Sequence, residues 1–289
     1  MKKTIGILAH VDAGKTTFSE QILYHTNAIR NRGRVDHKNS FLDSHDIEKE
    51  RGITVFSDQA SFELGKSTYY LIDTPGHIDF SCEMERAIGI MDYAIIVVSA
   101  VEGVQAHTET VWKLLEKYNV PTFLFINKLD RTGANLEKVI SEIKINLTKD
   151  ACYIDNITDI KDDVVEFIAE RNDDLLEKYL NGEYNNKLWI DELSKLIKER
   201  RIFPCFAGAA LQDIGISEFL NSLEEVSQSK SSLITTLTVS LFVVPSKSCA
   251  ISLGTVIVIS FVLSLFLHHN FFIKSNFNSI FINLLNSGR

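Results

Sequence analysis

Short apolar runs alternate with amphipathic segments over the first 226 residues of the chain. An apolar run without polar interruption is typical of a strand buried on both faces of a parallel sheet, and apolar positions three or four residues apart are typical of a helix. The alternation therefore predicts an α/β fold with a mostly parallel, doubly wound sheet that helices cover on both faces. The predicted strands are Ile5–Leu8, Val55–Leu64, Ser67–Ile72, Ala94–Ser99, Thr122–Ile126 and Ile202–Ala207, and the predicted helices are Thr17–Thr26, Asp79–Met91, His107–Tyr118 and Ile216–Val226.

One segment departs from this alternation. Residues 148–200 are rich in charged side chains, and two stretches within them, Asp173–Leu180 and Leu188–Ile197, have the spacing of amphipathic helices. They predict a helical insertion within a single domain that spans residues 1–226.

The stretch from Ala9 to Thr17 connects the first predicted strand to the first predicted helix. Strand, glycine-containing loop, Gly-Lys-Thr and helix is the order of a phosphate-binding P-loop, whose backbone N–H groups attract anions while its lysine contacts the β- and γ-phosphates. Ala9 stands where the simple pattern has its first glycine, and alanine is small enough for the turn. The predicted nucleotide-binding residues are Ala9, His10, Val11, Asp12, Ala13, Gly14, Lys15, Thr16 and Thr17, with the Thr16 hydroxyl as a Mg²⁺ ligand.

Two further motifs complete the predicted phosphate end. Asp73 would reach Mg²⁺ through a water molecule, and the turn at Gly76 would offer a backbone N–H to the γ-phosphate. Thr54 ends a long polar connection and would close over Mg²⁺ only while a γ-phosphate is bound, as in nucleotide-dependent switches. His77 follows the turn and is the candidate catalytic residue, because it could orient the attacking water. The predicted residues are Asp73, Thr74, Pro75, Gly76 and His77 for the nucleotide, and Thr54 and Asp73 for Mg²⁺.

The motif Asn127-Lys128-Leu129-Asp130 suits a guanine base. The Asp130 carboxylate can accept from guanine N1–H and the exocyclic amine together, whereas adenine has no such pair of donors, so ATP would leave the carboxylate unpaired. Lys128 would lay its alkyl stem over the base, and the segment Gly208-Ala209-Ala210 would offer backbone N–H groups to guanine O6. The predicted base-binding residues are Asn127, Lys128, Asp130, Gly208, Ala209 and Ala210.

The P-loop and the motifs at Asp73, Asn127 and Gly208 each follow a predicted strand, and ligands of open parallel sheets bind at the carboxyl ends of the strands. Any one motif has an ordinary explanation as a surface turn. Their joint occurrence, in this order, predicts a protein that binds GTP and GDP with Mg²⁺.

Composition and charge indicate which partners and sites the protein lacks and where it is located. The net charge is −8 at pH 7, and residues 1–225 carry all 38 acidic groups, so there is no gross electrostatic case for nucleic-acid binding and no direct binding to DNA is expected. The four cysteines are scattered without metal-ligand spacing, which argues against a zinc site or a disulfide scaffold. With no export signal at the basic start, these features predict a cytoplasmic protein.

Residues 227–289 have a different character. They are rich in Ser, Leu, Ile and Phe, contain no Asp or Glu, and include an uncharged apolar run at 248–267 that is long enough to span a membrane. A membrane anchor is one interpretation. The abrupt change of composition beside an intact set of motifs favours the other, a tail that arises from a shifted reading frame.

Residues 1–226 resemble the GTPase domain of translational GTPases, in particular the group of elongation factor G and the tetracycline-resistance ribosomal protection proteins. The resemblance implies a GTPase stimulated by the ribosome, in which His77 acts on water and Val11 with Ile53 gates it. Gly208-Ala209-Ala210 departs mildly from the family's Gly-Ser-Ala. The motifs that carry the resemblance are Ala9–Thr16, Arg51-Gly52-Ile53-Thr54, Asp73-Thr74-Pro75-Gly76-His77, Asn127-Lys128-Leu129-Asp130 and the insertion segment Asp173 to Gly182.

Family members continue into a β-barrel and further domains, so the resemblance implies a chain truncated or frameshifted after about residue 226. The leading hypothesis is a GTP hydrolase of the translation-factor class without its effector domains. The alternatives are a GTPase switch tethered to a membrane through residues 248–267, and a nucleotide-binding remnant without output. Elongation and tetracycline protection are not separated by these residues.

Overall fold

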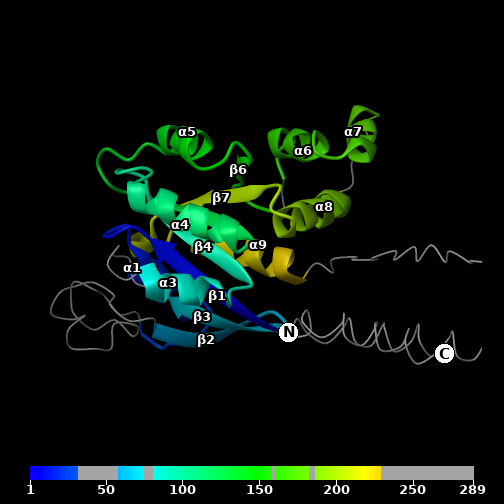
Figure 1. The fold of residues 1–289 in the computed structure, drawn as a ribbon. Helices are drawn as coiled ribbons and strands as arrows, with labels where there is room; N and C mark the ends of the chain where they lie inside the picture. Colours follow the sequence, from blue (N-terminus) through cyan, green and yellow to red (C-terminus); the bar gives the residue numbers. More distant parts are fainter. Residues whose placement is uncertain (32–57, 75–80, 158–159, 182–185, 229–289) are drawn as a thin grey trace, which may run out of the picture. The chain divides into compact units, whose positions relative to one another are not determined.

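The computed structural model describes residues 1–31, 58–74, 81–157, 160–181 and 186–228 (Figure 1). Within them, seven strands form one sheet with the order β2-β3-β1-β4-β5-β7-β6. Neighbouring strands are parallel throughout, except that β2 and β3 form an antiparallel hairpin. The strands are β1 Lys2–Ala9, β2 Asp58–Leu64, β3 Ser67–Asp73, β4 Tyr93–Ser99, β5 Thr122–Asn127, β6 Ala151–Tyr153 and β7 Phe203–Ala207.

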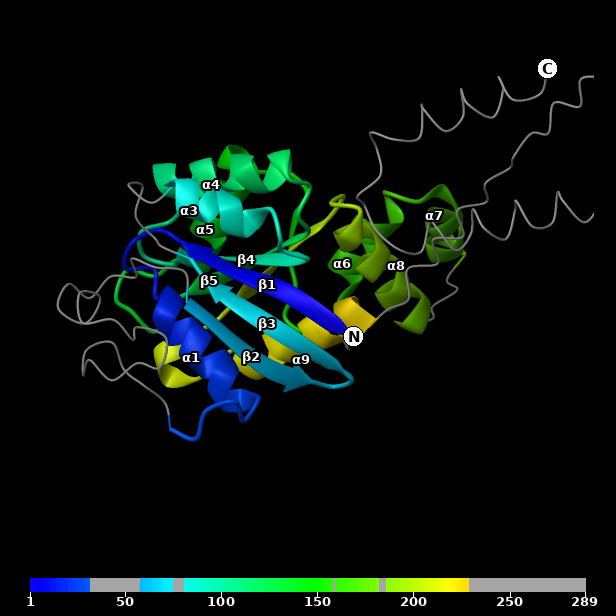
Figure 2. The same ribbon diagram turned by 60° about the horizontal axis from the view of Figure 1, so that its bottom comes forward.

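Helices cover both faces of the sheet. The helices α1 and α9 lie on one face, and α3, α4 and α5 lie on the other (Figures 1 and 2). The helices α6, α7 and α8 share the core of the first of these two layers, where α6 contacts β6 and α8 contacts α9 (Figure 1). Their bounds are α1 Lys15–His25, α3 Ser81–Ile88, α4 Ala106–Lys117, α5 Leu136–Asn146, α6 Asp162–Ala169, α7 Asp173–Leu180, α8 Asn186–Lys198 and α9 Ile216–Gln228, with a short 3₁₀ helix η3 at Ala210–Gln212.

The central strands are buried on both faces, which explains their uninterrupted apolar runs. Along β5, Phe123 and Phe125 point into the core under α1 and α9, whereas Leu124 and Ile126 point into the core under α3, α4 and α5. Successive side chains of a strand alternate between faces, so a strand with helices on both sides needs an apolar residue at every position.

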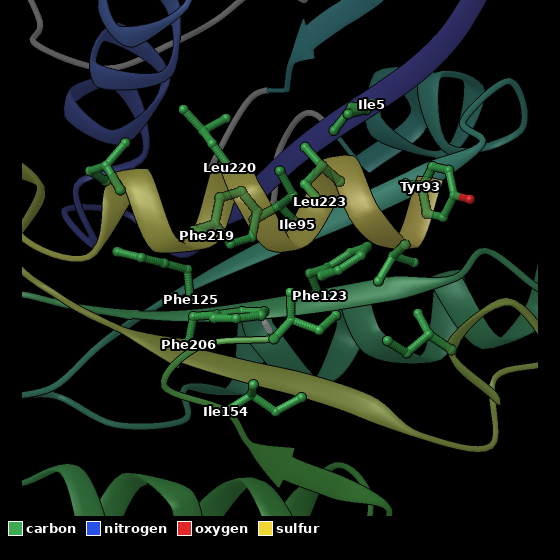
Figure 3. Packing of buried hydrophobic residues seen from close by; sticks show 14 of the residues in the cluster. Ile5, Tyr93, Ile95, Phe123, Phe125, Ile154, Phe206, Phe219, Leu220 and Leu223 are labelled. Carbon is green, nitrogen blue, oxygen red and sulfur yellow. The ribbon is translucent and has the colours of Figure 1, made fainter. Parts of the chain in front are cut away.

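An aromatic cluster fixes α1 and α9 to the sheet. The ring centroid of Phe219 on α9 lies 5.4 Å from that of Phe18 on α1 and 5.9 Å from that of Phe125 on β5. Phe123 and Phe206 complete the cluster, with centroids 6.0 and 5.4 Å from Phe219 (Figure 3). These edge-to-face contacts are favourable geometries for aromatic rings in a core.

The predicted elements agree with the structure in type, and their ends differ by a few residues. The helix α9 runs to Gln228, two residues past its predicted end at Val226. The hairpin of β2 and β3 turns at Gly65, in the gap between the two predicted strands. Residues 55–57 of the predicted strand Val55–Leu64 lie outside the described residues.

Neither β6 nor α5 was predicted. Within 148–200 the chain forms the helices α6, α7 and α8, but it also forms β6, which pairs in parallel with β7 at the edge of the sheet. A strand of three residues is too short to show a period. The helix α5, whose N-cap Asn135 side chain accepts a hydrogen bond from the Lys138 N–H, was missed as well.

The predicted membrane-spanning run at 248–267 and the rest of the tail from residue 229 lie outside the described residues. In the part of the chain that the structure describes, no helix combines the length and the apolar content that crossing a bilayer requires.

The aromatic cluster leads to a stability prediction. Phe219→Ala should lower the free energy of unfolding by about 3–5 kcal/mol, because it removes a fully buried ring and leaves a cavity between α1, α9 and β5. Denaturant unfolding of the 289-residue chain measures it. Leu180→Ala is the control, since that side chain is 75% exposed and its loss should change the value by less than about 0.5 kcal/mol. Similar losses in both variants would contradict the packing.

Candidate functional site

The predicted motifs converge at one edge of the sheet. Because β1, β3, β4, β5 and β7 are parallel, their carboxyl ends lie together there. The described candidate residues stand at or just after these ends: Ala9 ends β1, Asp73 ends β3, Asn127 ends β5 and Gly208 follows β7.

The loop between β1 and α1 has a backbone that only certain residues tolerate. Gly14, the N-cap of α1, has φ +92°, in the left-handed region. A Cβ atom on Gly14 would lie 2.3 Å from Asn127 Nδ2, so a side chain would be excluded by space as well as by conformation. Asp12, with φ 62°, adopts the same region. The loop is therefore shaped by one glycine that no other residue can replace without strain.

Lys15 and Asp73 form a buried ion pair. Lys15 Nζ donates to Asp73 Oδ2 at 2.5 Å, and both side chains are shielded, with 8% and 0% exposed. The Ser19 hydroxyl donates to the Lys15 carbonyl at 3.0 Å and lies 3.4 Å from Asp73 Oδ1. Burying two charges is costly unless they are paired and hydrogen-bonded, and this geometry satisfies that condition.

Asn127 joins two loops that are far apart in sequence. Its Nδ2 donates to the Ala13 carbonyl at 2.9 Å, and its Oδ1 accepts from the Ala210 N–H at 2.9 Å. The side chain is 3% exposed, and both ends of its amide are paired. Asn127 therefore holds the loop before α1 and the loop after β7 against each other.

The residues after Asn127 present a carboxylate at the surface. Lys128 has φ 68°, and the next N–H, that of Leu129, donates to the Gly208 carbonyl at 3.1 Å. Asp130 is exposed, and its Oδ2 accepts from Gln212 Nε2 at 3.3 Å. Gln212 was missed in the sequence analysis, because nothing in its neighbourhood along the chain indicates this contact.

The N–H groups of Gly208-Ala209-Ala210 already have partners within the protein. Gly208 donates to the Ile126 carbonyl at 2.9 Å, and Ala209 to the Ile214 carbonyl at 3.0 Å. Ala210 donates to Asn127, as described above. The expected contact from this segment to guanine O6 would have to share or replace one of these bonds, and it stays a prediction. A Cβ on Gly208 would lie 2.1 Å from the Ile214 oxygen, which explains the glycine there.

His10 is buried at the start of the loop between β1 and α1. Its Nδ1 lies 2.7 Å from the Val11 carbonyl oxygen, and its Nε2 lies 3.5 Å from Glu102 Oε2. Burial lowers the pKa of His10 below its ordinary value, although the Glu102 carboxylate acts in the opposite direction. His10 thus has contacts within the protein, and Glu102 is a partner that its sequence position did not reveal.

The other candidates divide into two groups. Thr74 is buried, and its hydroxyl donates to the Ile7 carbonyl at 2.8 Å, which ties β3 to β1. Val11 is exposed in the loop before α1, and Thr16 and Thr17 are half-buried at the start of α1. Thr54, Pro75, Gly76 and His77, and Ile53 with them, lie outside the described residues.

Comparison with known proteins now decides the family. The family described as "Elongation factor Tu GTP binding domain" matches residues 2–229. The chain belongs to this family.

Relatives of this GTP-binding domain carry two kinds of name. "Tetracycline resistance protein TetP" of Clostridium perfringens is 41% identical over 242 residues, which cover 77% of this chain and 37% of that protein. "Elongation factor G" of Carsonella ruddii is 37% identical over 265 residues, which cover 76% of this chain and 39% of that protein. The chain thus spans little more than a third of the length of these curated relatives.

A solved structure supports the fold independently. A crystal structure of a protein from Thermus thermophilus has a TM-score of 0.69 and 24% identity, and the match covers 78% of this chain and 40% of that one. Likeness at this level of identity shows the fold of the GTP-binding domain alone.

The described donors at the phosphate end suit Mg²⁺. The Thr16 hydroxyl and the Asp73 carboxylate are hard oxygen ligands, the kind that Mg²⁺ prefers, and such ions are commonly held by one or two protein groups together with substrate phosphates. Among the described residues no cluster of three His, Cys, Asp or Glu side chains could hold a metal by itself.

Gly14 generates a prediction about the loop. Gly14→Ala should destabilise the chain by about 1–2 kcal/mol through its positive φ, and by more through the contact with Asn127 Nδ2. Gly133→Ala is a matched control, because Gly133 has φ +90° and nothing lies within 4 Å of the position that its Cβ would take. Denaturant unfolding should therefore show a larger loss for Gly14→Ala. Equal losses would mean that Asn127 does not constrain the loop.

Proposed function

We propose that the chain binds GTP and GDP together with Mg²⁺ at the carboxyl edge of its sheet and hydrolyses GTP to GDP and phosphate. The observation that carries the proposal is the position of Asn127, whose amide joins the loop before α1 to the loop after β7. The phosphate motif and the guanine motif are thereby held at one site, and each alone would be weak support.

The phosphates would bind at the N-terminus of α1. Backbone N–H groups of the loop and of the first turn provide an anion site there, and the Lys15 ammonium adds a full positive charge. Lys15 is paired with Asp73 in this structure, so phosphate binding would exchange one anionic partner for another. When bound, Mg²⁺ would neutralise charge that develops on the phosphates, and Thr16 and Asp73 would hold it, Asp73 through water.

The base would bind between the segment Asn127–Asp130 and the loop after β7. Asp130 supplies an exposed carboxylate that can accept from guanine N1–H and from the exocyclic amine. Lys128 would cover the base with its alkyl stem. We propose Asn127 as the residue that holds the two sides of this pocket together, and Gly208, Ala209 and Ala210 as its backbone wall.

Hydrolysis would need a positioned water. We propose that His77 orients a water molecule for attack on the γ-phosphorus, and that the bond between this phosphorus and the β,γ-bridging oxygen breaks to release GDP and phosphate. Thr54 would close over Mg²⁺ while the γ-phosphate is present. Support for both roles comes from the motifs in the sequence and their resemblance to translational GTPases.

We further propose the translation-factor class for the whole protein, with the ribosome as its partner and the cytoplasm as its location. Support comes from family membership, and from relatives named for elongation factor G and for tetracycline resistance. The GTPase domain would span residues 1–226 with a helical insertion at about 148–200, followed by a separate tail at 227–289. Nothing in the described residues favours elongation over protection against tetracycline.

Asp130 provides a test of base specificity. Asp130→Asn should weaken GDP binding and improve binding of xanthosine diphosphate, because the amide donates a hydrogen bond where the carboxylate accepted one. Competition titrations of the 289-residue chain with Mg²⁺ measure both affinities, and ATP should compete poorly with the unsubstituted chain. Equal affinities for ATP and GTP would refute the proposed guanine site.

His77 provides a test of the hydrolytic step. His77→Ala should leave the affinity for GTP nearly unchanged and lower the rate of hydrolysis by about 10²-fold or more, the typical effect of losing a group that positions or activates water. Single-turnover hydrolysis in the presence of ribosomes measures the rate. A rate equal to that of the unsubstituted chain would remove His77 from the mechanism.

A further inference from the structure

Gln21 is a buried polar residue that the motifs leave unexplained. It lies on α1, less than two turns after Lys15, and its side chain is 4% exposed. Its Nε2 donates to the Ala210 carbonyl at 2.6 Å, a contact between residues 189 positions apart. Among the described residues its buried Oε1 has no hydrogen-bond partner, which carries a cost that a purely apolar side chain would avoid.

The contact closes a ring of hydrogen bonds around the proposed nucleotide site. From the Ala13 carbonyl the ring passes through the Asn127 amide to the Ala210 N–H, and from the Ala210 carbonyl to Gln21. The helix α1, which begins at Lys15, leads back from Gln21 to the loop that contains Ala13. The backbone of Ala210 is thus held through its N–H by the end of β5 and through its carbonyl by α1.

Ala210 is also the first residue of η3, whose last residue, Gln212, donates to the Asp130 carboxylate at 3.3 Å. The short helix therefore has one end held by Gln21 and the other end against Asp130. Any shift of Ala210 would move Gln212, and with it the donor that orients the carboxylate.

We propose that Gln21 is a positioning residue for guanine recognition: from the phosphate-binding helix it fixes η3 and, through Gln212, orients the Asp130 carboxylate. This inference rests on the proposed function, and it deepens that function by linking the phosphate end of the site to the discrimination of the base. A hydrogen bond between a buried amide and a carbonyl is short-ranged and directional, so its loss changes position as well as stability.

The loop should keep its fold when Gln21 is replaced. The Ala210 carbonyl also accepts from the Asp213 N–H at 3.2 Å, and the His25 imidazole contacts the Asp213 carboxylate. Gln21→Met keeps the length and shape of the side chain and removes both polar groups. Gln21→Asn keeps the amide, but it is one methylene too short to reach the carbonyl.

The test compares GDP with inosine diphosphate, which lacks the exocyclic amine that Asp130 would accept from. The unsubstituted 289-residue chain should prefer GDP, and Gln21→Met should reduce the ratio of the two affinities about three- to tenfold, the usual net effect of one hydrogen bond. Binding of inorganic tripolyphosphate, which reports on the phosphate end alone, should stay unchanged. Gln21→Asn should reproduce the loss.

Two controls separate positioning from a general loss of structure. Ser222→Ala removes a buried hydroxyl that donates to the Glu218 carbonyl on α9 and should leave the ratio unchanged. In an Asp130→Ala background, Gln21→Met should have no further effect on the ratio, because no carboxylate is left to orient.

The outcomes are distinct. If the unsubstituted chain shows no preference for GDP, the proposed function fails. If it shows the preference and Gln21→Met keeps the same ratio, the proposed function stands and Gln21 has no positioning role. Parallel weakening of GDP, inosine diphosphate and tripolyphosphate, or failure of both variants to fold, would assign Gln21 a purely structural role and overturn the inference.

Discussion

The carboxyl edge of the sheet depends on one buried amide. Asn127 ends β5, and its side chain satisfies a carbonyl in the loop before α1 and an N–H in the loop after β7. Without Asn127, these two buried groups would lose their hydrogen-bond partners. Leaving a buried polar group unpaired costs more free energy than a typical hydrogen bond contributes. Two loops separated by most of the domain are therefore fixed relative to each other before any ligand binds. Gly14 follows from the same constraint, since only a residue without Cβ leaves room for the Asn127 amide.

The phosphate end is preorganised by charge. The charges of Lys15 and Asp73 compensate each other in a buried position. The Ser19 hydroxyl donates to the Lys15 carbonyl and lies close to the Asp73 carboxylate. A buried ion pair contributes little net stability, because desolvation offsets most of the attraction. The ion pair instead fixes the positions of both groups. It holds the ammonium at the start of α1 and the carboxylate at the end of β3. A polyanion that approached the α1 N-terminus would find the lysine in place and would compete with Asp73 for it.

Much of the fold could be predicted because its strands are buried on both faces. Runs such as Phe123–Ile126 have apolar side chains at every position for a physical reason, so they indicate a parallel sheet as well as a strand. The motifs could be placed at one edge for the same reason. The structure added what periodicity does not encode. The strand β6 is too short to show a period, and the contacts of Gln21, Gln212 and Glu102 join groups that only the folded chain brings together. Polar residues of this kind look alike in a sequence whether they are solvated or form part of a site.

The helix α9 connects the proposed site, at the carboxyl ends of the strands, to the amino ends of β1 and β3. It begins immediately after the loop that carries Ala210 and Gln212, and it crosses the sheet over the aromatic cluster around Phe219. Its last turn reaches the opposite edge, where the Lys3 ammonium donates to the Ser227 carbonyl and the Tyr69 hydroxyl contacts the Ser227 hydroxyl. A cation at a helix C-terminus satisfies a terminal carbonyl and complements the helix dipole. The loop after β7 is consequently held by α1 on one side and by α9 on the other. The geometry of the proposed base site is therefore set by the core of the domain rather than by the loop alone.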